Sequence, residues 1–108
     1  MVEYNGFRML FTGDSSADEI MKHNEISGEI TVLKVPHHGA AGGVNKGLMK
    51  KFSPKYSIIS VGENKFGHPN LYTLEILKPS TILRTDIDNA IRIKVDKNGY
   101  QVLTYNIK

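Results

Sequence analysis

The chain contains no cysteine, which excludes disulfide bonds and thiolate metal sites. Any metal ion that this chain holds must therefore rely on histidine, aspartate and glutamate. No apolar run approaches the roughly 20 residues that cross a membrane, and the first residues do not have the pattern of a signal peptide. If the protein works at a membrane, we expect segments absent from this chain to bring it there.

A concentrated charge of one sign is also lacking. The net charge is +3 at pH 7, which mildly favours anionic partners such as nucleic acid, but the lysines are scattered and form no dense block. The apolar share of 40% and the charged share of 23% are typical of a folded globular domain, and 108 residues suffice for one domain. Charge alone therefore favours an ordinary solvated surface over a nucleic-acid patch.

Apolar segments bounded by turn residues predict an α/β (α+β) fold. We expect a hairpin around Asn5-Gly6, helices whose apolar spacing has the helical period, and further strands with alternating or continuous apolar residues. The expected helices are 17–23, 45–52 and 71–78, and the expected later strands are 30–35, 56–61, 81–84, 90–95 and 100–107. This order predicts a mixed sheet with helices on one face. The first hairpin strand is very short, so we expect residues 1–108 to be part of a larger domain.

Three of the expected strands run into segments that carry acid, base or metal-binding groups. Asp14 follows the apolar strand that ends near residue 11, and His37 and His38 follow the strand 30–35. His68 lies in a Gly-His-Pro segment after the strand 56–61. Strand ends are where α/β sheets build their sites. A carboxylate with imidazoles is a donor set suited to zinc or manganese.

Each of these residues also has an ordinary structural explanation. Asp14 alone is better explained as a helix cap or turn residue, and His68 alone as a solvent-exposed side chain. The adjacent imidazoles of His37 and His38 are harder to bury, because four ring nitrogens need partners, and for them function and structure stay equally open. The combination of all of them carries more weight than any single residue.

The order of several short segments resembles a known family. They are residues 11–14 (Phe-Thr-Gly-Asp), 33–39 (Leu-Lys-Val-Pro-His-His-Gly), 59–62, 66–69 (Phe-Gly-His-Pro) and 84–86 (Arg-Thr-Asp). Together they are similar to the carboxy-terminal half of a metallo-β-lactamase-like domain. Such domains occur at the end of late-competence DNA-uptake channel proteins and as stand-alone hydrolases. The resemblance covers nearly the whole chain and implies about half of an αββα sandwich.

The resemblance implies a centre of two divalent metal ions, zinc or manganese, in the intact domain. Asp14 matches the aspartate that bridges both ions, and His38 matches the last histidine ligand. His37 is then left to contact a substrate phosphate or to assist the leaving group, although the two histidines can exchange roles. His68 and Asp86 match recurring positions that line or brace the site.

This chain also departs from the family pattern. No His-x-His-x-Asp-His segment is present, Ala40 stands where serine is usual, and Asp88-Asn89 replaces an acidic-glycine turn. A catalytic metal ion needs about three protein ligands. We therefore expect the missing amino-terminal half of the domain to be a partner of this chain, and the isolated chain to bind metal weakly and to be inactive.

Three hypotheses follow. In the first, the chain is part of a metal-dependent hydrolase of the phosphodiesterase or nuclease type, linked to DNA uptake, on the extracellular face of the bacterial cytoplasmic membrane. In the second, it is a non-catalytic module for assembly or DNA binding. In the third, a half sandwich leaves an apolar sheet face uncovered, and the chain forms a homodimer through that face.

Overall fold

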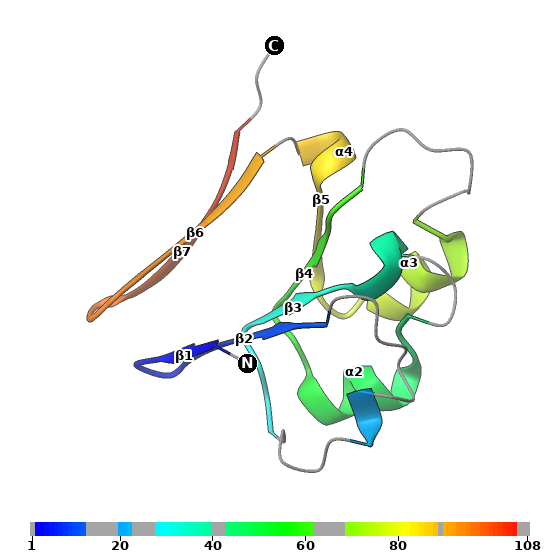
Figure 1. Ribbon diagram of the computed structural model, residues 1–108, viewed down its shortest axis with the longest axis horizontal. Coiled ribbons are helices and arrows are strands. Elements are labelled where there is room, and N and C mark those ends of the chain that lie inside the picture. Colours follow the sequence, from blue (N-terminus) through cyan, green and yellow to red (C-terminus); the bar gives the residue numbers. More distant parts are fainter. Residues whose placement is uncertain are drawn as a thin grey trace.

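The computed structural model describes residues 2–12, 20–22, 28–39, 43–61, 69–88 and 90–105. It has the predicted mixed α+β fold (Figure 1). The elements in chain order are β1 (Val2–Tyr4), β2 (Phe7–Phe11), β3 (Val32–Lys34), the 3-10 turn η1 (Pro36–Gly39), α2 (Lys46–Phe52), β4 (Tyr56–Ile59), α3 (Leu71–Leu77), β5 (Thr81–Arg84), α4 (Thr85–Asp88), β6 (Ala90–Asp96) and β7 (Gly99–Tyr105).

The main sheet has five strands in the order β1-β2-β3-β4-β5. β1 and β2 form the predicted hairpin, and Asn5 and Gly6 at its turn have φ angles of 46° and 86°. Positive φ at both central residues is what a tight hairpin turn of this kind requires. β2, β3, β4 and β5 pair in parallel, so the sheet is mixed. β6 and β7 form a separate antiparallel sheet.

Asparagine side chains cap the first turns of α2 and α3. The Asn45 side chain accepts a hydrogen bond of 2.7 Å from the Leu48 amide at the start of α2. The Asn70 side chain accepts one of 2.8 Å from the Tyr72 amide at the start of α3. Each bond satisfies an amide that has no partner inside its helix. The helix expected over 71–78 therefore starts at the predicted residue, and the helix expected from residue 45 starts one residue later, because Asn45 is its cap.

The buried face of α3 differs from the expected one. The helical spacing predicts that Leu71 shares one apolar face with Leu74 and with Leu77 or Ile76, but Leu71 is 83% exposed. The buried side chains of α3 are instead Thr73, Ile76 and Leu77. These positions recur at helical spacing on one stripe, and the first residue of the helix lies outside that stripe.

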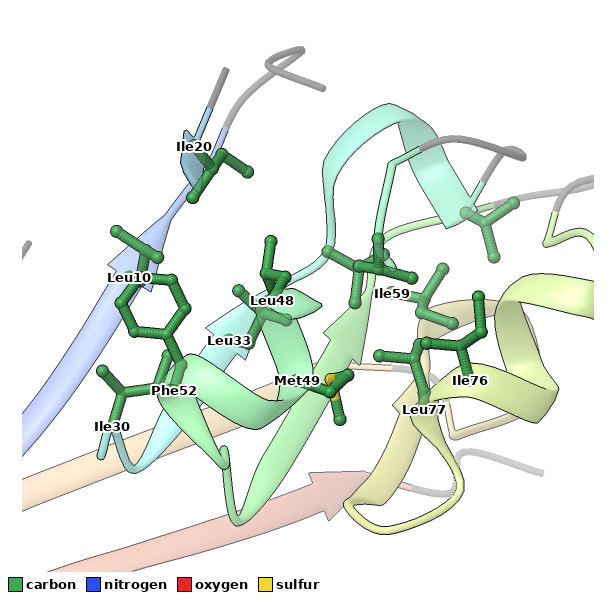
Figure 2. Packing of buried hydrophobic residues seen from close by; sticks show 13 residues of the cluster. Leu10, Ile20, Ile30, Leu33, Leu48, Met49, Phe52, Ile59, Ile76 and Leu77 are labelled. Carbon is green, nitrogen blue, oxygen red and sulfur yellow. The ribbon is translucent and has the colours of Figure 1, made fainter. Parts of the chain in front are cut away.

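Both helices pack on one face of the main sheet, as predicted. A hydrophobic core cluster lies between the sheet and these helices. It joins the strand residues Leu10, Leu33 and Ile59 to helix residues such as Phe52 and Leu77 (Figure 2). Phe52, Leu33, Ile59 and Leu77 are fully buried. This burial of apolar surface fixes the positions of α2 and α3 on the sheet.

The other face of the main sheet is covered in part by the β6-β7 hairpin, which lies opposite α2 and α3 in Figure 1. Phe7, Val32 and Ile58 are buried there, and the inward side chains of the hairpin pack against them. The rings of Phe7 and Tyr100 are 5.4 Å apart. The expectation that this face is bare is therefore wrong beneath the hairpin. Dimerisation through its remaining surface stays a prediction.

Two other predicted segments have different outcomes. The turn expected near residues 86–89 is a short helical turn, α4, over residues 85–88. Most of the expected helix 17–23 lies outside the described residues, and the part that is described, 20–22, includes the buried Ile20. Within the described ranges, no helix combines the length and apolar character of a membrane span.

Candidate functional site

The carboxyl ends of β2, β3, β4 and β5 lie at one edge of the main sheet, because these strands run parallel. Their registers pair Phe11 with Lys34, Lys34 with Ile58, and Ile59 with Arg84. Every segment that carries a predicted site residue starts at this edge. The segment with Asp14 follows β2, and the segment with His37 and His38 follows β3. The segment with His68 follows β4, and the segment with Asp86 follows β5. This edge, called the carboxyl edge below, is the candidate site.

A side-chain hydrogen bond joins the ends of β2 and β3. Thr12 is buried, and its hydroxyl donates to the Lys34 carbonyl oxygen. Thr12 precedes the Gly13-Asp14 segment, and Lys34 is the last residue of β3 before η1. The bond therefore holds together the two points from which the Asp14 segment and the histidine turn leave the sheet.

The turn η1 carries both adjacent histidines, and it packs against the end of the segment that contains His68. Gly39, the last residue of η1, has a φ of 81°, and a Cβ atom added to it would lie 2.5 Å from the Pro69 Cβ. The Asn70 amide donates a hydrogen bond of 2.8 Å to the Gly39 carbonyl oxygen. The end of the histidine turn therefore packs directly against Pro69 and Asn70, where the description of the chain resumes before α3.

The ends of β4 and β5 are joined by one hydroxyl. Thr85 accepts a hydrogen bond of 2.7 Å from the Val61 amide and donates one of 2.9 Å to the Val61 carbonyl oxygen. A side chain thus replaces the backbone pairing where the two strands separate. The carboxyl edge is therefore held by contacts between each pair of neighbouring parallel strands.

Asp86 is the predicted site residue whose side chain the structure describes. Its carboxylate forms a two-pronged pair with the Arg84 guanidinium, with distances of 3.0 Å from Nε and 2.6 Å from Nη2. The hydrogen bond from Arg84 holds the pKa of Asp86 below its usual value. Asp88 accepts a hydrogen bond of 2.8 Å from the Arg84 amide. Asp86, in α4, thus lies at the carboxyl edge and pairs with Arg84, the last residue of β5.

The remaining predicted side chains, those of Asp14, His37, His38 and His68, lie outside the described part of the structure. Their assigned roles therefore stay predictions. Among the described residues, no group of three or more histidine, cysteine, aspartate or glutamate side chains could hold a metal ion. In the sequence, the segments that leave the carboxyl edge carry a carboxylate and imidazoles, a donor set that zinc and manganese accept.

A cleft of about 390 Å³ opens between the main sheet and the β6-β7 hairpin, at the carboxyl edge. The last side chains of the parallel strands and the first residues beyond them form its rim, and hairpin isoleucines form its opposite wall. Its lining residues are Met9, Phe11, Lys34, Ile58, Ser60, Thr85, Ile91 and Ile93.

Lys34 is the charged residue among the described side chains that line this cleft, and the sequence pattern did not indicate it as a site residue. It is half-buried, and burial lowers the pKa of its ammonium group below the usual 10.5. One signal was available in the sequence, since Lys34 is the one charged residue of the strand expected over residues 30–35 and shares a face with Val32. The hairpin that completes the cleft could not be placed over this face from the sequence pattern.

A second groove, of about 480 Å³, lies between α2 and α3, near the amino ends of β4 and β5. Lys46, Lys50 and Glu75 line it together with apolar side chains. It is at the opposite end of the strands from the carboxyl edge, so it is separate from the candidate site.

Comparison with protein-family models, with curated proteins and with solved structures finds no match to this chain.

Proposed function

We propose that this chain is part of a metal-dependent hydrolase domain that cleaves phosphodiester bonds. The observation that carries the proposal is the common start, at one edge of a parallel sheet, of every segment with a predicted site residue. Hydrogen bonds and close packing between neighbouring segments hold these starting points together. An edge of this kind is where α/β sheets assemble residues from several segments into one site.

In this proposal Asp14 and His38 hold divalent metal ions, zinc or manganese. Such ions, when bound, supply Lewis-acid activation of water and of the phosphate. His37 contacts the substrate phosphate and protonates the departing oxygen, a role that histidine side chains commonly take as general acids. Asp86 braces the edge through Arg84, and His68 lines the site. If the two adjacent histidines exchange roles, His37 becomes the ligand.

The proposed centre is incomplete in this chain. Two donors are fewer than the roughly three protein ligands that a catalytic ion needs, so an amino-terminal half of the domain supplies the others. The resemblance to domains of DNA-uptake channel proteins makes DNA the proposed substrate, at the outer face of the cytoplasmic membrane of a bacterium. The membrane is reached through segments absent from this chain.

The test is hydrolysis of bis(p-nitrophenyl) phosphate in the presence of zinc or manganese, by this chain and by a chain extended with the residues encoded before it. We expect no turnover and weak metal binding from this chain, and turnover from the extended chain. Asp14→Asn and His38→Ala should each abolish that turnover, whereas Glu75→Gln, on the exposed face of α3, should leave it unchanged. An extended chain that is inactive, or whose activity survives both site variants, contradicts the proposal.

A second candidate function is DNA binding without catalysis, and the lysines of α2 favour it. Lys46, Lys50 and Lys51 lie on this short helix, and Lys55 follows it. Such a cluster attracts phosphates independently of sequence, with an affinity that falls as salt rises. Salt-dependent DNA binding that survives Asp14→Ala with His38→Ala, and is lost with Lys46→Gln and Lys50→Gln, would favour this function over hydrolysis.

A further inference from the structure

The cleft between the hairpin and the main sheet combines an apolar lining with a single cation. Met9, Phe11 and Ile58 of the sheet and Ile91 and Ile93 of the hairpin provide its apolar walls. Lys34 is the only charged residue among the described side chains that line the cleft. Its volume of about 390 Å³ lies within the range of about 300–1,000 Å³ that small-molecule sites occupy.

The Lys34 ammonium has no anionic partner within the described part of the chain. The ion pairs found there join Arg8 to Glu3, Lys78 to Glu75, and Arg84 to Asp86. Partial burial removes water from the Lys34 ammonium, which raises the free energy of its charged form. An anion that enters the cleft would offset this cost.

We propose that this cleft binds a small molecule in which one apolar ring or chain carries one anionic group, with the Lys34 ammonium opposite the anion. The apolar part lies between Ile58 of the sheet and Ile93 of the hairpin. Ser60 and Thr85 also line the cleft, and the strand registers put them on the same side of the sheet as Lys34. This inference concerns binding alone and does not require the proposed metal centre.

The probe for the test is 1-anilinonaphthalene-8-sulfonate, an aromatic anion whose fluorescence rises in apolar surroundings. N-phenyl-1-naphthylamine has a similar apolar body without the charge and serves as its neutral counterpart. We expect Lys34→Met to weaken binding of the anionic probe about tenfold, the effect of one charge-assisted contact. Binding of the neutral probe should change less than twofold, because methionine keeps the wall apolar.

Two further variants keep the test falsifiable. Lys34→Arg should retain the affinity for the anionic probe, since it keeps the charge at this position. Lys94→Met removes an exposed lysine from the outer face of β6 and should leave both probes unaffected. The proposal is overturned if Lys34→Met has no effect on the anionic probe, if it weakens both probes equally, or if Lys94→Met has the same effect.

Competition then identifies the kind of ligand. Displacement of the bound anionic probe by 1-naphthyl phosphate supports an aromatic phosphate, and displacement by decanoate supports a lipid acid. Displacement by neither compound, at concentrations that saturate comparable sites, overturns the proposal.

Discussion

Gly39 and Pro69 are in direct contact, although they belong to segments that leave two different strands. A Cβ atom at Gly39 would lie 2.5 Å from the Pro69 Cβ and 3.0 Å from its Cα, and φ at Gly39 is 81°. The neighbouring Asn70 amide donates a hydrogen bond to the Gly39 carbonyl oxygen. The contact therefore links the histidine turn to the end of the segment with His68.

Gly39→Ala should be strongly destabilising. The left-handed φ costs about 1–2 kcal/mol for alanine, and overpacking against Pro69 costs a further 1–3 kcal/mol or so. The free energy of unfolding should fall by the sum, as measured by urea denaturation. Gly6→Ala is the matched control, because Gly6 has a φ of 86° with no atom near its Cβ position. Equal losses from the two variants would show that the contact with Pro69 contributes nothing.

Thr12→Val should weaken the connection between β2 and β3. The change keeps the shape of a buried side chain but removes the hydroxyl that bonds the Lys34 carbonyl oxygen. Leaving that acceptor without its partner should cost about 1–2 kcal/mol of unfolding free energy. Thr104→Val, at an exposed position of β7, should change it by less than about 0.5 kcal/mol. A neutral effect of Thr12→Val would mean that the strand ends are held together by other contacts.

Asp86→Asn should remove the ion pair with Arg84 and reduce stability by about 0.5–1 kcal/mol near neutral pH. The pKa of Asp86 is lowered in the folded state, chiefly by the hydrogen bond from Arg84. The contribution of Asp86 to the free energy of unfolding is therefore present above the usual pKa of 3.8. In the wild type it is lost as the pH falls below 3.8 through the lowered pKa.

Glu75→Gln is the control for Asp86→Asn, because the Glu75–Lys78 pair is about two-thirds exposed on both sides. It should have little effect at any pH. Acid titrations of unfolding free energy in which Asp86→Asn keeps the wild-type pH dependence would contradict the assigned role of the pair.

Lys34→Met should raise the free energy of unfolding at neutral pH. Burial lowers the pKa of Lys34 in the folded state, so the unfolded chain binds the proton more tightly. Wild-type stability therefore gains from deprotonation of Lys34 as the pH rises from this lowered pKa toward 10.5. The difference in the free energy of unfolding between Lys34→Met and the wild type should narrow over that interval. If the difference in unfolding free energy for Lys34→Met does not change with pH, the wild-type Lys34 ammonium is exposed to water and the assigned burial is wrong.

Local signals in the sequence account for much of the fold. Asn70 is identifiable as a helix cap, and Asn5-Gly6 as a hairpin turn, because each acts through its own neighbouring backbone, whereas the helical spacing placed Asn45 inside α2 rather than at its cap. The exposure of Leu71 was not predictable in this way, since the buried stripe of α3 depends on what the helix packs against. The same holds for the β6-β7 hairpin, whose alternating pattern indicates a buried face but not the surface that it covers.

For the candidate site, the sequence indicated which strand ends carry carboxylate and imidazole groups. Parallel pairing then brings those ends to one edge, a step that needs only the strand order. The hydrogen bonds of Thr12 and Thr85 depend on the strand register, and the Lys34 cleft depends on where the β6-β7 hairpin lies. The periodicity of the sequence specifies neither. Asp86 was selected for its match to a family motif, and its pairing with Arg84 became evident only from the geometry.

The central claim is that Asp14 and His38 lie together at the carboxyl edge, and intramolecular cross-linking tests it most directly. The chain has no cysteine, so Asp14→Cys with His38→Cys introduces the only two thiols. Asp14→Cys with Asn98→Cys is the control, because Asn98 lies at the turn of the β6-β7 hairpin. The account predicts that a short bifunctional thiol reagent bridges the first pair in the folded protein but not the second, and loses that preference in urea. Failure to bridge the first pair, or equal bridging of both, would contradict the claim.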